Sequence, residues 1–195
     1  QNYGSPLRKF TINQTNKLKD SFKDNKNLII DYAMRYGNPS IEKVLNKIVE
    51  KGCSKLLLVP LYPQYAASTT ATVKDEVFKW MLKQRWQPDI RTIAPWFDDK
   101  NYIKALADTV NSNLKNKNTL DKLIVSFHGI PQRYFKAGDP YHCHCIKTAR
   151  LLKEELKWPD DKILVTFQSR FGPEPWLQPY TDKTIIELAK SGKKR

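Results

Sequence analysis

The chain alternates short apolar runs with longer segments in which apolar residues recur every three or four positions. Short apolar runs bounded by turn-forming residues are typical of buried β-strands, and we expect strands at 28–33, 55–59, 90–94, 123–128 and 162–167. Apolar residues at helical spacing are typical of amphipathic helices, which we expect at 5–24, 41–52, 69–81, 98–114, 145–156 and 184–189. This alternation of strand and helix predicts an α/β fold with parallel sheets.

Two stretches of the chain, 28–52 and 163–192, follow the same plan. Each has an apolar strand, then an Arg-aromatic-Gly sequence (Arg35–Gly37 and Arg170–Gly172), then a proline-containing loop and an amphipathic helix that ends at glycine. The repeat predicts two similar α/β halves. The first copy continues into the strand at 55–59, whereas the sequence stops where the matching strand of the second copy would begin. We therefore expect a missing piece at the C-terminal end.

The polar, lysine-rich stretch 113–118 is the best candidate for a boundary between the halves. It divides the chain into an N-terminal α/β lobe with a linking helix, residues 1–112, and a C-terminal α/β lobe, residues 113–195. The expected fold class is thus α/β, with two Rossmann-like halves that each contain a parallel sheet.

The composition narrows the class of protein. With 195 residues, of which 40% are hydrophobic, the chain is long and apolar enough to form a real core. No apolar run could span a bilayer, and the first residues lack the pattern of a secretory signal peptide. The odd set of three cysteines, Cys53, Cys143 and Cys145, argues against a disulfide framework and for a reducing compartment. We expect a cytoplasmic protein.

The formal net charge is +14, and the lysines are spread along the whole chain. A nucleic-acid binder would carry one of the usual motifs or a stripe of arginine and aromatic residues, and neither is present. A lysine-rich solvated surface explains the charge without any partner. An anionic partner, such as a membrane surface or a ligand that bears propionates, is the other explanation that stays open.

His128 is the candidate for chemistry. It follows the apolar run 123–125 and precedes Gly129-Ile130-Pro131, so it lies where a strand gives way to a loop. In open α/β sheets, this carboxyl edge is where ligands bind. Neutral imidazole accepts protons near neutral pH and coordinates transition metals, which makes His128 a candidate base and metal ligand. The alternative is a histidine that only makes a local hydrogen bond in the loop.

Six separated motifs follow one another along the chain. They are GSPL (4–7), MRYGNP (34–39), LYPQYAASTTA (61–71), SFHGIP (126–131), GDPYHC (138–143) and FQSRFGPEPWLQPYTD (167–182). In this order, and over nearly the whole chain, they resemble the motifs of the ferrochelatase family, whose members insert ferrous iron into a porphyrin. The resemblance covers the central portion of these enzymes, without the family's first strand and without the later segment whose glutamate faces the metal-site histidine. We therefore expect a chain truncated at both ends.

The resemblance implies a function and its partners. The implied activity is insertion of Fe²⁺ into protoporphyrin IX, which gives protoheme in heme biosynthesis. The open alternatives are a chelatase for coproporphyrin or another tetrapyrrole, and a non-catalytic fragment that binds porphyrin or heme. The expected partners are porphyrin and ferrous iron, with possible peripheral contact with a membrane and no nucleic acid.

The resemblance also assigns roles to individual residues. His128 matches the family's metal histidine, so it is the expected catalytic base and iron ligand. The porphyrin-contacting positions of the family match Ser5, Arg35 or Tyr36, Tyr65 and Trp176. Three of these residues have a competing interpretation: a helix cap for Ser5, a surface salt bridge for Arg35 and core packing for Trp176.

The sequence His142-Cys143-His144-Cys145 suggests a zinc or iron–sulfur site at first sight. A closed site needs four ligands, usually from two separated pairs, and this chain has no second pair. Within one helix the four side chains point in different directions. Some ferrochelatases hold a [2Fe–2S] cluster, and the animal form has one ligand where this chain has Ala67. We expect no cluster and no required cofactor, because the iron is a substrate.

Overall fold

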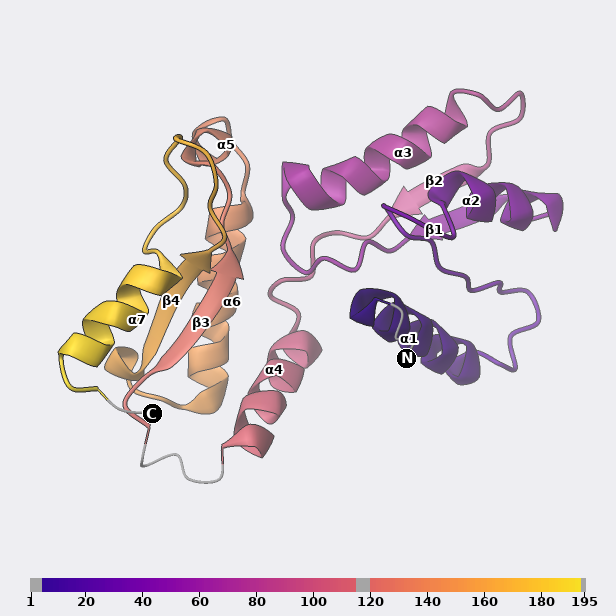
Figure 1. Ribbon diagram of the computed structural model, residues 1–195. Coiled ribbons are helices and arrows are strands. Elements are labelled where there is room, and N and C mark those ends of the chain that lie inside the picture. Colours follow the sequence, from indigo (N-terminus) through magenta and orange to yellow (C-terminus); the bar gives the residue numbers. More distant parts are fainter. Residues whose placement is uncertain (1–4, 115–119, 194–195) are drawn as a thin grey trace. The chain divides into compact units, whose positions relative to one another are not determined.

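The computed structural model describes residues 5–114 and 120–193 (Figure 1). Its helices are α1 (Pro6–Ser21), α2 (Ile41–Glu50), α3 (Thr72–Met81), α4 (Lys100–Asn113), α5 (Gln132–Lys136), α6 (Tyr141–Leu156) and α7 (Thr181–Lys190). Its strands are β1 (Lys55–Leu58), β2 (Asp89–Thr92), β3 (Leu123–His128) and β4 (Ile163–Gln168). A π-helical turn, Ala67–Ala71, precedes α3, and a 3₁₀ turn, Asp160–Lys162, precedes β4.

The four strands form two small parallel sheets among the described residues. Strand β1 pairs with β2, and β3 pairs with β4 in a register that sets His128 beside Gln168. Parallel strands need a crossover, and the helices α3 and α6 lie in the two crossovers. The predicted α/β class with parallel sheets is therefore confirmed.

The chain forms two compact units. The described residues up to 60, together with 70–93, form the first unit; residues 61–69 and those from 94 onward form the second. Helix α4 belongs to the second unit, where it packs on α6. The predicted lobes 1–112 and 113–195 divide the chain by sequence alone, and that division stays a prediction.

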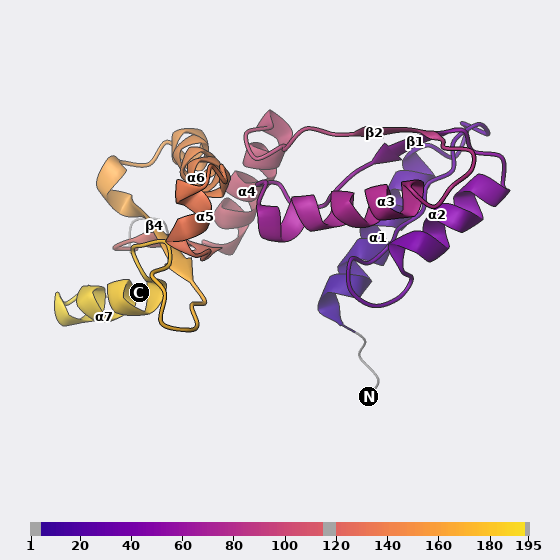
Figure 2. The ribbon, with the colours of Figure 1, turned by 90° about the horizontal axis from the view of Figure 1, so that it is seen from above.

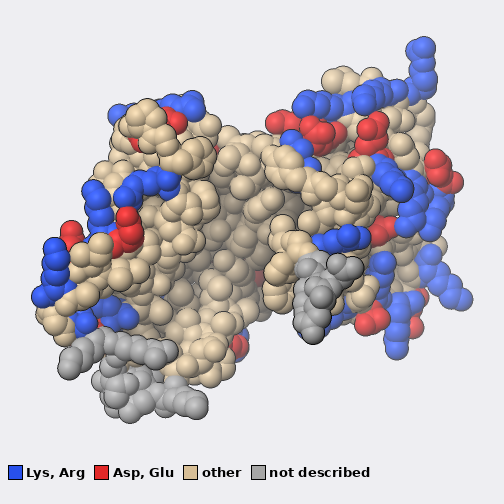
Figure 3. All heavy atoms as spheres, in the orientation of Figure 1, with Lys and Arg blue, Asp and Glu red and all other residues tan. Residues whose placement is uncertain are grey.

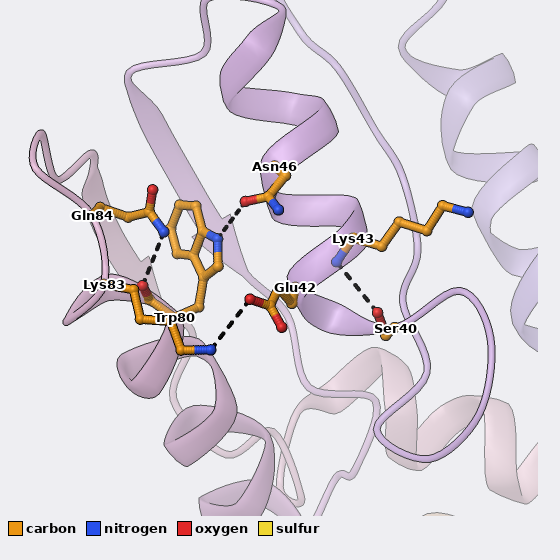
Figure 4. A network of polar contacts seen from close by, with 7 residues as sticks. All are labelled: Ser40, Glu42, Lys43, Asn46, Trp80, Lys83 and Gln84. Atoms are coloured by element: carbon orange, nitrogen blue, oxygen red, sulfur yellow. Dashed lines mark hydrogen bonds and ion pairs between the residues drawn. The ribbon is translucent and has the colours of Figure 1, made fainter.

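In the first unit, α2 and α3 pack through Trp80 (Figure 4). The Trp80 side chain is 2% exposed, and its indole Nε1–H donates to Asn46 Oδ1 at 2.7 Å. The hydroxyl of Ser40 accepts from the backbone N–H of Lys43 at 3.3 Å and caps the start of α2. A buried aromatic with its one polar atom satisfied is a stable way to join two helices.

The apolar run 28–33 does not form the predicted strand. Only Met34, just beyond it, makes an isolated parallel bridge, to Ser40. A strand needs a neighbouring backbone to complete its ladder, and β1 already pairs with β2 while 28–33 has no ladder partner in the described chain. Leu28 and Ile29 are consequently exposed, at 45% and 39%.

The loops of the predicted repeat have the same backbone contact in both copies. The N–H of Met34 donates to the carbonyl of Pro39 at 2.8 Å, and the N–H of Phe167 donates to the carbonyl of Pro179 at 2.8 Å. In each copy a helix, α2 or α7, begins two residues after that proline. The repeat is thus confirmed for the loop and the helix, although only the second copy contains the strand.

In the second unit, α6 and α7 lie on opposite faces of the β3–β4 sheet (Figures 1 and 2). One buried cluster joins α4, α6 and β4 and consists of Ala107, Leu152, Leu156 and Ile163. A second cluster lies beneath the ends of β3 and β4 and consists of Ile130, Cys145, Phe167 and Leu177. These clusters make the carboxyl edge of the sheet a fixed platform.

Two local details differ from the predictions. Helix α4 begins at Lys100 and not at 98, and the carboxylate of Asp99 caps it by accepting from the N–H groups of Asn101 and Tyr102 at 2.9 and 3.1 Å. The expected loop after β3 contains the short helix α5. Shifts of one or two residues are common at helix ends.

Candidate active site at the carboxyl edge of the second sheet

His128 is the last residue of β3, and its side chain is exposed. Its ring Nδ1 lies 2.7 Å from the carbonyl oxygen of Gly129. A carbonyl oxygen only accepts hydrogen bonds, so Nδ1 carries the hydrogen and Nε2 of the neutral ring keeps its lone pair. The local hydrogen bond and the chemical role are therefore compatible: the bond selects the tautomer that a base or a metal ligand needs.

Gly129 is closely packed behind this histidine. Its N–H donates to the carbonyl of Gln168 at 2.6 Å. A Cβ atom at this position would lie 3.0 Å from that same carbonyl oxygen and 3.3 Å from the ring of Trp176. The turn after β3 thus requires the absence of a side chain, and the close contact with β4 fixes where His128 begins to leave the sheet.

Trp176 forms the support beneath this turn. It is 5% exposed, and its indole Nε1–H donates to the carbonyl of Phe171 at 3.0 Å. The Phe171 ring lies 4.9 Å from the Trp176 ring, centroid to centroid, and is 76% exposed. Core packing therefore accounts for most of the Trp176 surface, and its contact with porphyrin stays a prediction.

Tyr65 lies in the segment 62–67. Two backbone N–H groups of this segment are bound by side chains at the start of α6 and just before it. The N–H of Tyr65 donates to Nδ1 of His144 at 3.2 Å, and the N–H of Ala67 donates to the Asp139 carboxylate at 2.8 Å. The other Asp139 oxygen accepts from the N–H of Tyr141 at 3.0 Å, in the first turn of α6. We refer to Asp139 and His144 together as the α6 latch.

The ring of His144 is itself fixed. It stacks on Phe97 with ring centroids 3.7 Å apart and an interplanar angle of 11°. Burial lowers the pKa of His144 below its ordinary value, so the neutral ring is favoured. A further tie comes from Thr148, whose hydroxyl accepts from the Gln64 amide at 3.0 Å and donates to the carbonyl of Phe97 at 2.8 Å.

The side chains of His142–Cys145 have different surroundings in α6. Cys145 is fully buried, and burial raises the pKa of its thiol to about 12, which disfavours the thiolate that a metal would bind. His142 stacks against Phe167, with ring centroids 5.6 Å apart. Across residues 5–114 and 120–193, no three His, Cys, Asp or Glu side chains come together as a metal site.

The remaining predicted residues lie in the first unit. The guanidinium of Arg35 lies 4.5 Å above the Tyr36 ring and 3.6 Å from the Glu76 carboxylate, while its buried Nε has no hydrogen-bond partner among residues 5–114 and 120–193. Tyr36 is 72% exposed. Ser5 occupies the N-cap position of α1, but its hydroxyl makes no capping hydrogen bond.

The structure brings the predicted residues into two groups. His128, Tyr65 and Trp176 belong to the second unit, and Ser5, Arg35 and Tyr36 belong to the first. The sequence reasoning gave no role to Asp139 or His144, although both lie next to or within the GDPYHC motif. The motif marks this part of the chain in the sequence. That Asp139 and His144 bind the segment 62–67 is visible only in the structure.

The comparisons with known proteins identify the family. The family model described as Ferrochelatase matches residues 2–195. The chain belongs to the ferrochelatase family. It is 56% identical over 192 residues to the ferrochelatase of Allorhizobium ampelinum, 56% over 195 residues to that of Agrobacterium fabrum and 53% over 190 residues to that of Rhizobium meliloti.

These ferrochelatases are longer than the chain described here. The matches cover 98%, 98% and 97% of this chain but 56% of each relative, so the chain spans just over half of their length. Among solved structures, SirB from Bacillus subtilis with Fe³⁺ has a TM-score of 0.64 and 18% identity, covering 95% of this chain and 68% of that one. That likeness supports the two-half chelatase fold.

The helices of this ferrochelatase-family chain do not have the length and apolar character of a membrane span in the described residues.

Proposed function

We propose that the protein is a ferrochelatase that inserts Fe²⁺ into protoporphyrin IX and releases two protons, a step of heme biosynthesis. The observation that carries the proposal is the exposed His128 at the carboxyl edge, whose Nδ1 is hydrogen-bonded to the Gly129 carbonyl, which leaves the lone pair of the neutral ring on Nε2. The family membership supports this reaction class.

The reaction requires a base for the pyrrole protons and a ligand for the iron on one face of the porphyrin ring. Nε2 of His128 accepts a proton from a pyrrole nitrogen, and the resulting imidazolium passes it to water because the side chain is exposed. The Gly129 carbonyl stabilises that imidazolium through a charge-assisted hydrogen bond. In its neutral form the same nitrogen is a ligand for the incoming iron.

The porphyrin needs a charged contact and aromatic surfaces. The unpartnered Nε of Arg35 suits a propionate carboxylate, which would satisfy a buried donor that otherwise has no acceptor. The exposed ring of Tyr36 offers an aromatic surface in the same unit. Ser5, Tyr65 and Trp176 complete the proposed porphyrin contacts, as the family motifs imply.

The proposal includes no cofactor and no iron–sulfur cluster. Iron enters and leaves the reaction as Fe²⁺, so the step itself transfers no electron. We place the enzyme in the cytoplasm, with peripheral membrane contact, because its porphyrin substrate is poorly soluble in water.

The direct test is replacement of His128 in the protein expressed from its complete gene. We expect His128→Ala to lower the rate of Fe²⁺ insertion at least about a hundredfold, while protoporphyrin IX binding, measured by fluorescence quenching, changes little. The control is His142→Ala, since His142 packs on Phe167 and has no assigned part in the reaction. Insertion by His128→Ala within a few-fold of the parent would overturn the assignment.

A porphyrin series tests the substrate in the same assay. We expect Fe²⁺ to be inserted into protoporphyrin IX faster than into coproporphyrin, and faster than Co²⁺ is inserted into another metal-free tetrapyrrole. A preference for coproporphyrin would leave the reaction class intact and replace the substrate.

A further inference from the structure

The α6 latch acts on the segment 62–67 only through backbone atoms. His144 and Asp139 accept from the N–H groups of Tyr65 and Ala67, and neither contact depends on what the Tyr65 side chain does. Fixing both N–H groups fixes the direction in which the Tyr65 side chain leaves the backbone. The latch therefore controls the placement of a proposed porphyrin contact from residues that need not touch porphyrin.

We propose that Asp139 and His144 are positioning residues for Tyr65, and that protonation of His144 loosens the segment 62–67 at Tyr65 and weakens porphyrin binding. The inference rests on the proposed function, because Tyr65 is a porphyrin contact only there. The two parts can nevertheless be tested separately, since the latch can be measured without porphyrin.

The tautomer of His144 makes the latch sensitive to protons. Because the N–H of Tyr65 donates to Nδ1, that nitrogen must be bare, and the ring hydrogen must lie on Nε2. A second proton can bind only at Nδ1, where it would face the Tyr65 N–H. Protonation thus removes the hydrogen bond and sets two donors against each other.

The groups around His144 set the direction of the pH effect. Burial against the Phe97 ring disfavours the imidazolium and is the largest influence, the carboxylates of Asp98 and Asp139 favour it, and the ammonium of Lys147 opposes it. The net result is a lowered pKa in the held state. When the segment loosens, the Tyr65 N–H no longer blocks Nδ1 and the ring is less buried, so its pKa rises towards the ordinary value of about 6.5.

A lowered pKa means that the loosened state binds the proton more tightly. The His144 contribution to holding the segment is therefore complete above about pH 6.5 and is lost as the pH falls from there through the lower pKa of the held state. The Gln64–Thr148 hydrogen bond contains no titrating group and remains in acid. We expect the segment to loosen at Tyr65 and not to detach completely.

The first arm of the test measures the latch alone. In the protein from its complete gene, NMR hydrogen exchange gives a protection factor for the Tyr65 amide, which corrects for the intrinsic pH dependence of exchange. We expect this factor to fall about tenfold between about pH 7.5 and about pH 5.5, because one hydrogen bond is lost. Equal protection at both pH values would overturn the pH-dependent latch.

Two variants of His144 distinguish the loss of the hydrogen-bond acceptor from the loss of the group that can be protonated. His144→Asn keeps an acceptor near the position of Nδ1 but cannot be protonated, so protection should stay high at both pH values. His144→Ala removes the acceptor, so protection should be low at both. The matched control, His142→Asn, lies on the same helix and packs on Phe167, so it should keep the pH dependence of the parent. The same fall in His144→Asn as in the parent would overturn the role of His144.

The second arm measures protoporphyrin IX affinity by fluorescence quenching at the same pH values. We expect the ratio of the affinities of His144→Asn and the parent to rise about tenfold in acid, and this ratio removes the titration of porphyrin itself. A constant ratio, with exchange behaving as expected, would overturn the positioning of Tyr65 for porphyrin. Absence of binding at every pH would instead contradict the proposed function, and the exchange arm would still decide the latch.

Discussion

At the end of β3, the contacts of Gly129 link the shape of the backbone to the chemistry of its neighbour. Its carbonyl fixes the His128 tautomer, and its missing side chain lets the backbone approach Gln168 to 2.6 Å. Gly129 thus binds Nδ1 of His128 through its carbonyl and joins the end of β3 to the end of β4 through its N–H. A glycine in a strand-to-loop turn often marks such a close approach, and here the approaching atoms are known.

This contact predicts the effect of Gly129→Ala. The added Cβ would lie 3.0 Å from the Gln168 carbonyl oxygen, which is backbone and cannot swing away, and 3.3 Å from the Trp176 ring. We expect the free energy of unfolding to fall by about 1–3 kcal/mol and Fe²⁺ insertion to fall with it. Thermal and denaturant unfolding measure the first effect. A variant as stable and as active as the parent would contradict the close packing.

The repeat offers a matched pair of arginines. Arg170 makes two hydrogen bonds of 2.9 Å to the Asp182 carboxylate, whereas Arg35 has a single ion pair of 3.6 Å with Glu76 and a buried Nε without a partner. We expect Arg35→Gln to weaken protoporphyrin IX binding about tenfold at nearly unchanged stability, because an ion pair of this kind contributes less than about 1 kcal/mol. Arg170→Gln is the control and should leave porphyrin affinity unchanged. Equal affinities for the parent and Arg35→Gln would remove Arg35 from the site.

At the scale of the elements, the sequence indicates some structures well and others poorly. The strands β3 and β4 could be predicted from their apolar runs. The prediction holds because the two runs pair with each other in a parallel ladder. The run 28–33 has an equally apolar sequence but no ladder, because pairing depends on a second stretch of backbone that local preference does not describe. The position of His128 at the end of a strand could be predicted from the residues around it, whereas its role stays a prediction. The latch could not, because Tyr65 and His144 lie 79 positions apart.

The α2–α3 contact supplies a test at this scale (Figure 4). Asn46→Ala removes the acceptor of the Trp80 indole N–H, and we expect a loss of about 1 kcal/mol in the free energy of unfolding. The control is Lys83→Ala, which removes the ion pair with Glu42 at 3.3 Å, where both side chains are more than half exposed. That control should cost less than about 0.5 kcal/mol. Equal losses in the two variants would show that the indole hydrogen bond has no special weight.

At the scale of the whole molecule, the net charge of +14 has two explanations: binding of an anionic partner, or a lysine-rich surface that is simply solvated by water. Lys and Arg side chains are spread over both units on the face shown in Figure 3, with Asp and Glu among them. In the first unit, a hollow of about 400 Å³ beside the end of α1 is lined by apolar residues and by five lysines, of which Lys47 is paired with Asp31 at 2.8 Å; the lysines are Lys19, Lys23, Lys26, Lys47 and Lys51. A basic rim around apolar side chains suits an anionic membrane surface.

We therefore expect the protein to sediment with anionic vesicles and not with neutral ones, and to lose this binding as salt is raised. Each lysine near an anionic leaflet contributes about 1 kcal/mol, so Lys23→Gln with Lys26→Gln should weaken binding about tenfold or more. The control pair is Lys136→Gln with Lys190→Gln, in the second unit. Tighter binding to an oligonucleotide than to anionic vesicles, or no binding to either, would contradict membrane docking.

The segment 61–69 belongs to the second unit, although the chain on both sides of it belongs to the first. The backbone therefore passes between the units three times, after residues 60, 69 and 93. No single cut of the chain leaves both units whole. A gene fragment that begins at residue 113 would lose both α4, whose Ala107 is part of the core, and the strip of chain held by Asp139 and His144. The two units therefore do not correspond to two consecutive pieces of the chain, so an exchange between relatives would have to move both together.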